Sequence, residues 1–221
     1  MTTDEEIKKK LTDQLYWDTR VDASDIDIDV NGSSVTLSGK VPNYSAKQSA
    51  VLDAWNISGV SNVNNNIKVK FPPKFTIPDD KNIKEYTNSL IKWNTSIDES
   101  DVDIEVNKGE ITLSGTVTSY YEKTRAEEIS SDVLGVREVH NELTVVPTDD
   151  ILDKIVAENI VDAMDRNFLV DPEKFTVTVE KGIVTVTGEV PNYTTYKEAM
   201  SCIEHTNGVI DVQDNIRINF E

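Results

Sequence analysis

The sequence has little of what catalytic and membrane-spanning proteins need. Its 221 residues include one cysteine and two histidines. The single cysteine, Cys202, excludes an internal disulfide framework and a cysteine-rich zinc site. No stretch approaches the roughly 18 consecutive apolar residues of a membrane-spanning helix, which excludes such a helix.

Motifs for chemistry are also missing. The two histidines, His140 and His205, lie in different parts of the chain. There is no Ser-His-Asp order, no glycine-rich phosphate loop and no cluster of metal ligands. We therefore expect neither an enzyme nor a protein with a cofactor or a dedicated metal site.

Basic side chains are scarce relative to acidic ones. The chain has 22 Lys and Arg against 40 Asp and Glu, a net charge of −18. Such a chain repels phosphate groups, so we expect no general binding to nucleic acid. The same charge disfavours a simple electrostatic attachment to anionic lipid.

The first residues, "MTTDEEIKKKLTDQLYW", contain no apolar leader and no small-residue cleavage site. We therefore expect a cytoplasmic protein, with a periplasmic location as the alternative if a leader has been removed.

One segment occurs three times along the chain. The copies read "SSVTLSGKVPNYSAK" (33–47), "GEITLSGTVTSYYEK" (109–123) and "GIVTVTGEVPNYTTY" (182–196). The glycines that anchor them, 76 and 73 residues apart, are Gly39, Gly115 and Gly188. A second glycine follows each after 20 residues, with a valine behind it: Gly59, Gly135 and Gly208. This constant spacing predicts three copies of one structural unit.

Carboxylates alternate with apolar residues in the first copy, in "DIDIDVNG" (25–32). A calcium loop of the EF-hand type also alternates oxygens, but it has glycine at position six and glutamate at position twelve, here Val30 and Thr36. The counterparts "DVDIEV" (101–106) and "KFTVTV" (174–179) keep the apolar alternation, and the third lacks the acids. We therefore expect a strand whose carboxylates face solvent, with calcium binding as the weaker alternative.

Each unit is expected to run helix, strand, strand, helix, strand. Glycine-containing turns at Asn31–Gly32, Lys108–Gly109 and Lys181–Gly182 favour a hairpin of the first two strands. A helical crossover then makes the second and third strands parallel. The predicted fold class is α+β, with three tandem αββαβ domains, each a small mixed three-stranded sheet with two helices on one face.

Three sets of residues have predicted structural roles in this unit. The first glycines lack a side chain on the inward face, which indicates a close approach by a helix or a strand bend. The second glycines suit helix C-caps. The residues expected to cap the second helix at its N-terminus are Asn43, Ser119 and Asn192.

The predicted domains are repeat 1 (1–71), a proline-rich linker (72–79), repeat 2 (80–146), a short linker (147–150) and repeat 3 (151–221). The first linker should act as a semi-rigid spacer between repeats 1 and 2, and the second should force repeats 2 and 3 into contact. Repeat 1 has ten acidic and eight basic residues, a net charge of −2. Repeat 2 has fourteen and seven, a net −7, and residues 149–221 have fifteen and six, a net −9.

The repeats resemble BON domains, a module named for bacterial osmotically inducible and nodulation proteins. The resemblance rests on "VTLSGKV" (35–41), on the Gly-Val pair 20 residues after the first glycine, and on closing strands such as "VHNELTV" (139–145). It covers nearly the whole chain and implies the αββαβ layout. The family is generally taken to bind phospholipid or to tether proteins at the bacterial envelope, and one cytoplasmic type is linked to potassium sensing. It supplies no residue with a chemical role.

The resemblance therefore implies a non-catalytic binding or scaffolding protein, associated with phospholipid or the envelope and with stress. The alternatives are a cytoplasmic protein-interaction scaffold and an ion-sensing module of the potassium type. The partner is expected to be a phospholipid surface or another protein. The candidate contacts in the least acidic repeat are Lys8, Lys9, Lys10, Trp17 and Trp55.

Aromatic residues recur at two places in the repeats. Trp17 and Trp93 stand at equivalent positions, at the end of the first helix. A tyrosine begins the second helix in every copy: Tyr44, Tyr120 and Tyr193. We expect these tyrosines to seal the junction between helix and sheet within their own repeat, with an interface to lipid or to a partner protein as the alternative.

Overall fold

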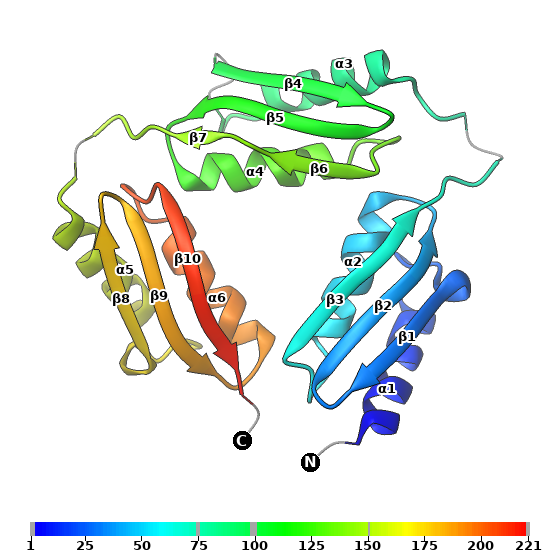
Figure 1. Ribbon diagram of the computed structural model, residues 1–221. Helices are drawn as coiled ribbons and strands as arrows, with labels where there is room; N and C mark the ends of the chain where they lie inside the picture. Colours follow the sequence, from blue (N-terminus) through cyan, green and yellow to red (C-terminus); the bar gives the residue numbers. More distant parts are fainter. Residues whose placement is uncertain (1–2, 74–75, 98–100, 150, 220–221) are drawn as a thin grey trace.

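Three similar units surround a common centre in the computed structural model of the chain (Figure 1). The structure describes residues 3–73, 76–97, 101–149 and 151–219. Each unit is a mixed sheet with two helices on one face, which confirms the predicted fold class.

Repeat 1 contains helix α1 (Asp4–Trp17), the 3-10 turn η1 (Ala23–Asp25), strands β1 (Ile26–Asn31) and β2 (Ser34–Val41), helix α2 (Tyr44–Trp55) and strand β3 (Asn62–Val69). The sheet order is β1-β2-β3, with β1 antiparallel and β3 parallel to β2. This is the topology that a hairpin followed by a helical crossover predicts.

The other two repeats follow the same order. Repeat 2 has α3 (Asp80–Lys92), β4 (Val102–Asn107), β5 (Glu110–Val117), α4 (Tyr120–Ser131), β6 (Glu138–Asn141) and β7 (Thr144–Val145), so its third strand is split in two. Repeat 3 has α5 (Asp153–Arg166), η3 (Pro172–Lys174), β8 (Phe175–Glu180), β9 (Ile183–Val190), α6 (Tyr193–Glu204) and β10 (Asp211–Ile218).

Each repeat has its own core between helices and sheet. In repeat 1, Ile7, Leu11 and Leu15 recur at steps of four on α1 and are at most 1% exposed, and they meet Val35 and Leu37 of β2, which are fully buried. The predicted N-caps of the second helices are confirmed, because the side chains of Asn43, Ser119 and Asn192 each accept a hydrogen bond from a backbone N–H in the first turn.

In repeats 2 and 3, a carboxylate accepts hydrogen bonds from the backbone of the hairpin turn. Asp80 accepts hydrogen bonds from the backbone N–H groups of Lys108 and Gly109 at 2.7 and 2.9 Å. Asp153 does the same for Lys181 and Gly182 at 2.8 and 2.9 Å. These bonds offset the cost of a positive φ at each lysine, 53° and 54°.

In repeat 1 the turn lies one residue later than the sequence predicts. Asn31 pairs with Ser34, so Gly32 and Ser33 form the turn.

The first glycines admit the backbone at the end of the short 3-10 turn that precedes the first strand, and not one of the two α-helices. A Cβ on Gly39 would lie 2.0 Å from the carbonyl oxygen of Asp25, and one on Gly115 would lie 2.0 Å from that of Asp101. Both have φ values that disfavour side chains, 109° and 106°. Gly188 differs, because its φ is not left-handed and its Cβ would meet Lys174 O at 2.7 Å.

The prediction that the second glycines cap helices is wrong. The C-caps are Asn56, Asp132 and His205, three residues before each glycine. The glycines lie in the following turn, with φ values of 102°, 101° and 89° for Gly59, Gly135 and Gly208. The first helix also packs there, since a Cβ on Gly135 would lie 2.8 Å from Ile83 Cδ1 of α3.

The prediction that a stiff linker separates repeats 1 and 2 is also wrong. Arg137 Nη1 of repeat 2 donates to the carbonyl oxygen of Val69 at 3.2 Å, and its guanidinium lies 4.8 Å from the centre of the Phe71 ring. The prolines restrict the path of the linker. The contacts of Arg137 are made by residues outside the linker, and they bring the two repeats together.

Candidate functional site

The second helices, α2, α4 and α6, form the three sides of a triangle at the centre of the molecule (Figure 1). Tyr44 of α2 packs against the core of repeat 2, and Tyr120 of α4 packs against the core of repeat 3. Tyr193 of α6 stacks on Trp55 of α2 with ring centres 5.1 Å apart. The tyrosine of each repeat thus contacts another repeat, and the three contacts form a closed circle.

Equivalent positions meet at the corners of this triangle. Ser45, next to Tyr44, donates a hydrogen bond to Asp132 at 2.9 Å. At the next corner, the ring of Tyr121 lies 4.8 Å from that of His205. In each case the N-terminus of one second helix meets the C-terminus of another, an arrangement in which the helix dipoles attract.

The tyrosines are half-buried in acidic surroundings. Burial is the main cause of the raised pKa of Tyr44, and the charges of Glu127 and Glu138 of repeat 2 raise it further. Burial likewise raises the pKa of Tyr120, with help from Glu204 and Asp211 of repeat 3. The prediction that the tyrosines pack within their own repeat is confirmed for Tyr44 and Tyr120, which contact the cores of repeats 1 and 2. All three tyrosines also form the alternative that the sequence left open, a contact with another repeat.

Trp55 belongs to this set of contacts. The sequence places it among the candidate contacts for lipid or a partner, and the structure places it in a stack with Tyr193. Its apolar surface is therefore partly covered by repeat 3.

The other candidate contacts lie on α1. Lys8, Lys9 and Lys10 are exposed in the middle of the helix. Trp17 ends the helix, is 78% exposed and contacts Tyr16 edge to face at 5.2 Å. This surface has basic side chains along one helix and an aromatic pair at its C-terminal end.

Repeats 2 and 3 expose an aromatic residue in the same loop after the first helix. Trp93 is the C-cap of α3 and is 83% exposed. Phe168 follows the C-cap of α5 and is 94% exposed. The sequence indicated the match between Trp17 and Trp93 but missed Phe168, which is displaced by two positions in the aligned repeats.

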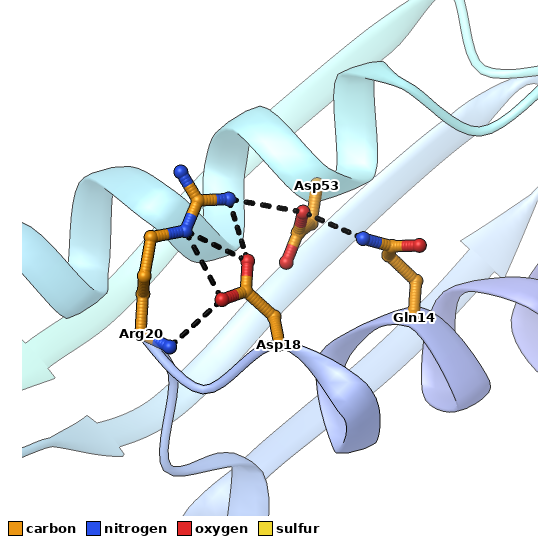
Figure 2. Close-up of polar contacts among 4 residues, drawn as sticks. All are labelled: Gln14, Asp18, Arg20 and Asp53. Carbon is orange, nitrogen blue, oxygen red and sulfur yellow. Dashed lines mark hydrogen bonds and ion pairs between the residues drawn. The ribbon is translucent and has the colours of Figure 1, made fainter.

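A polar cluster holds the chain just beyond Trp17 against α2 (Figure 2). Arg20 binds Asp18 through its backbone N–H at 2.8 Å and through Nε at 3.0 Å. Its Nη2 also lies 3.7 Å from Asp53 Oδ1 of α2, which accepts a hydrogen bond from Gln14 Nε2 at 3.1 Å. The cluster ties the end of α1 to α2 and so positions the loop that follows Trp17.

The two carboxyl groups of this cluster titrate in opposite directions. Hydrogen bonds from Arg20 lower the pKa of Asp18 to about 2. Burial raises the pKa of Asp53, and Gln14 opposes that rise by donating a hydrogen bond to it. Asp53 is 2% exposed and its Oδ2 is buried without a hydrogen-bond partner. Loss of a proton from Asp53 therefore weakens the folded state.

Sequence reasoning missed Asp53, although a signal was present. The equivalent residues of the other repeats are Ile129 and Cys202, so a charged residue stands where its counterparts are apolar. Cys202 packs against the core of repeat 3, and burial raises the pKa of its thiol. Cys202 therefore acts as a small apolar residue at this position.

The acidic motif of repeat 1 lies on the open face of the sheet. Asp27 and Asp29 of β1 are exposed, and Ile26, Ile28 and Val30 alternate with them toward the core. Among the described residues, no group of three or more His, Cys, Asp or Glu side chains is arranged to hold a metal ion.

Two further observations concern membranes and catalysis. Within the described ranges, none of the helices is long and apolar enough to cross a membrane. His140 is exposed on β6, where it pairs with Thr112 of β5.

Comparison with known proteins matches this architecture. The BON domain family matches the chain three times, at residues 3–70, 79–147 and 152–219. Osmotically-inducible protein Y of Escherichia coli (strain K12) is 30% identical over 149 residues, which are 63% of this chain and 71% of that protein.

Among solved structures, the C-terminal domain of CdsD, a structural protein of the type III secretion system of Chlamydia trachomatis, is 13% identical with a TM-score of 0.28. That alignment covers 98% of this chain and 96% of the solved one. A second CdsD structure is also 13% identical, with a TM-score of 0.27 and coverages of 98% and 93%.

The three matches to the family model coincide with the three αββαβ units and together span almost the entire chain. The protein therefore belongs to the BON domain family.

Proposed function

We propose that this protein is a non-catalytic binding protein of the bacterial response to osmotic stress, and that it attaches to phospholipid surfaces through the outer end of repeat 1. The family and the name of the relative, Osmotically-inducible protein Y, support the role in stress. The observation that supports the lipid contact is Trp17, which is 78% exposed on the least acidic repeat.

The chemistry of this surface fits the boundary between water and lipid. Tryptophan favours the headgroup level of a bilayer, because its ring is apolar and its indole N–H is polar. Lys8, Lys9 and Lys10 lie on the same helix, and each lysine near an anionic surface contributes about 1 kcal/mol. Three such lysines and one aromatic pair give weak, reversible attachment, which suits a protein that is recruited under particular conditions.

The remaining charge limits how the whole chain approaches. Repeats 2 and 3 bring net charges of −7 and −9, which an anionic surface repels. Because charges on exposed groups are screened beyond about 8 Å at physiological ionic strength, repeat 1 can touch the surface while the acidic repeats stay away from it. Trp93 stands at the equivalent place in acidic repeat 2, so it serves as a matched control for Trp17.

Flotation of the full chain with anionic vesicles tests the proposal. We expect Trp17→Ala to remove most of the vesicle-bound fraction and Trp93→Ala to leave it nearly unchanged. Replacing Lys8, Lys9 and Lys10 by glutamine should have the same effect as about 0.5 M salt, since both remove the electrostatic contribution.

Two outcomes would contradict it. Equal losses with Trp17→Ala and Trp93→Ala would show that repeat 2 contacts lipid as much as repeat 1 does. If neither the wild-type chain nor its variants float, a scaffold for protein partners becomes the better explanation of the exposed aromatic loops.

A further inference from the structure

The first strand of every repeat has one free edge. Strands β1, β4 and β8 lie on the outer rim of the molecule (Figure 1), and among the described residues they pair only with β2, β5 and β9, respectively. A free edge presents unpaired N–H and C=O groups to any other strand, so natural proteins commonly block it with charged side chains.

The register shows which backbone groups of β8 are free. Glu180 and Ile183 flank the two-residue turn, so they form a hydrogen-bonded pair. Antiparallel pairs alternate in type, so Thr178 and Thr176 also bond toward β9. The N–H and C=O groups of Val177 and Val179 and the C=O of Phe175 therefore point outward, whereas the N–H of Phe175 donates to Pro172 O in η3. The same pattern leaves Ile28 and Val30 with outward groups on β1, where the N–H of Ile26 donates to Ala23 O.

Repeats 1 and 2 carry charges that oppose pairing with a second copy. An antiparallel pair of β1 strands centred on Ile28 would place Asp27 opposite Asp29 of the other copy, twice. A pair of β4 strands centred on Ile104 would place Asp103 opposite Glu105, also twice. Like charges directly opposite each other destabilise strand pairing.

The free edge of repeat 3 lacks these opposing charges. Thr176 and Thr178 replace the carboxylates on its open face, and both are exposed. In an antiparallel pair of β8 strands centred on Val177, they lie opposite each other. Lys174, which directly precedes the strand, then faces Glu180 of the other copy. Neither Lys174 nor Glu180 has an ion-pair partner in the part of the chain that the structure describes.

We propose that β8 is a self-complementary dimerisation edge, which joins two copies of the chain into one continuous sheet with the order β10-β9-β8-β8-β9-β10. The register centred on Val177 pairs the N–H and C=O groups of the two Val177 residues with each other, and it pairs the N–H of Val179 with the C=O of Phe175 in the other strand. The same register places Lys174 opposite Glu180 at both ends of the pair.

A second copy fits this edge better than an unrelated strand does. The sequence from Glu173 to Lys181 complements its own reverse in charge, whereas an unrelated strand would have to supply that order by chance. Helix α5, which packs over β8, exposes Ile155 and Val161 at 44% and 42%. A twofold axis perpendicular to the sheet keeps both α5 helices on the same face, where these side chains add apolar area.

Sedimentation of the full chain tests the proposal. One strand pair forms a small interface, so we expect reversible dimers with a Kd on the order of 100 µM. Lys174→Glu turns two attractive pairs into repulsive ones and should weaken the dimer about tenfold. Adding Glu180→Lys restores opposite charges across the twofold axis and the wild-type net charge, and it should restore the dimer. A chain that stays monomeric at about 1 mM, or a double variant no tighter than Lys174→Glu, overturns the proposal.

Amide hydrogen exchange locates the edge with controls inside the same molecule. We expect the amides of Val177 and Val179 to become more protected as concentration rises, while those of Ile28 and Ile104 do not change. Thr176→Asp together with Thr178→Asp, which places carboxylates of the two copies opposite each other as on β1, should abolish the gain. Gln213→Asp together with Asn215→Asp adds the same charge on the distant strand β10 and should retain it. Protection at β1 or β4 instead of β8 would contradict the assignment.

Discussion

Repeats 1 and 3 have the same backbone fold and differ in net charge and in where their charged side chains lie. Repeat 1 has a net charge of −2, buries Asp53 beneath α1, and lines its free edge with Asp27 and Asp29. Repeat 3 has a net charge of −9 over residues 149–221, places Cys202 at the position of Asp53, and lines the same edge with threonines. The fold is the same because most of the differing residues lie outside the shared pattern of buried apolar residues and glycines. The one buried exception, Asp53, has polar partners in Gln14 and Arg20.

The difference also shows where new properties arise in a tandem array. Each repeat needs only its alternating strands, its amphipathic first helix and its turn residues to fold. The open sheet face, the outer edge and the loop after the first helix are free of that requirement. These surfaces differ most between the repeats, and they are where we place the lipid contact and the dimerisation edge.

The largest expected effect comes from the first glycine. Gly115→Val should destabilise repeat 2 by about 4 kcal/mol, because a Cβ would lie 2.0 Å from the carbonyl oxygen of Asp101 at a φ of 106°. Gly188→Val should cost clearly less, since its φ is not left-handed. Urea unfolding of both variants measures the difference, and equal losses would contradict the comparison.

The contacts between repeats should come next. Tyr120→Ala should cost about 2 kcal/mol, because it removes a half-buried ring from the core of repeat 3. Tyr193→Ala should cost about 1 kcal/mol, because it removes a stacked pair with Trp55. Calorimetry should show the unfolding of separate repeats in Tyr120→Ala, and small-angle scattering should show a larger radius in Tyr193→Ala. An unchanged radius would mean that other contacts keep the ring closed.

The buried carboxylate of repeat 1 should give a smaller, pH-dependent effect. The raised pKa of Asp53 means that the folded state binds its proton more tightly than the unfolded state. Stability therefore increases as pH falls through the folded pKa toward the ordinary value of 3.8. Asp53→Asn should add about 1 kcal/mol at pH 7, and the gain should shrink as pH approaches 4.

Asp18 acts in the opposite direction, because its pKa is lowered to about 2. Its contribution is present above the ordinary value of 3.8 and is lost as pH falls from there toward 2. Urea unfolding at a series of pH values, with Asp53→Asn beside the wild type, separates the two groups. A gain that is the same at pH 7 and pH 4 would show that the charge of Asp53 is not the cause.

The smallest expected effect concerns calcium and the open face of repeat 1. Asp27 and Asp29 point into solvent from one strand, so millimolar Ca²⁺ should give only weak effects that salt removes. Calorimetry of the wild type and Asp27→Asn tests this. A saturable site of micromolar affinity that disappears in the variant would overturn the interpretation of the motif as a strand.

The sequence by itself determined the repeat, its order of helices and strands, and the N-caps of the second helices. These features depend on local patterns: alternation for strands, steps of four for α1, and a short polar residue before a helix. It failed where the backbone partner is distant in sequence. The neighbour of Gly115 is Asp101, and the partner of Lys108 and Gly109 is Asp80, and neither pairing follows from a local period.

Only the tertiary structure decided how the repeats meet. From the sequence, we interpret Tyr44, Tyr120 and Tyr193 as residues that pack within their own repeats. Periodicity shows that a side chain is half-buried, but it does not show which residues cover it. The tyrosines do pack within their own repeats, but each has a further partner in another repeat, and Trp55 changes from a candidate surface residue to the partner of Tyr193 for the same reason. Local propensity and burial pattern are properties of one segment, whereas contacts between repeats depend on where the closed ring places two surfaces that are far apart along the chain.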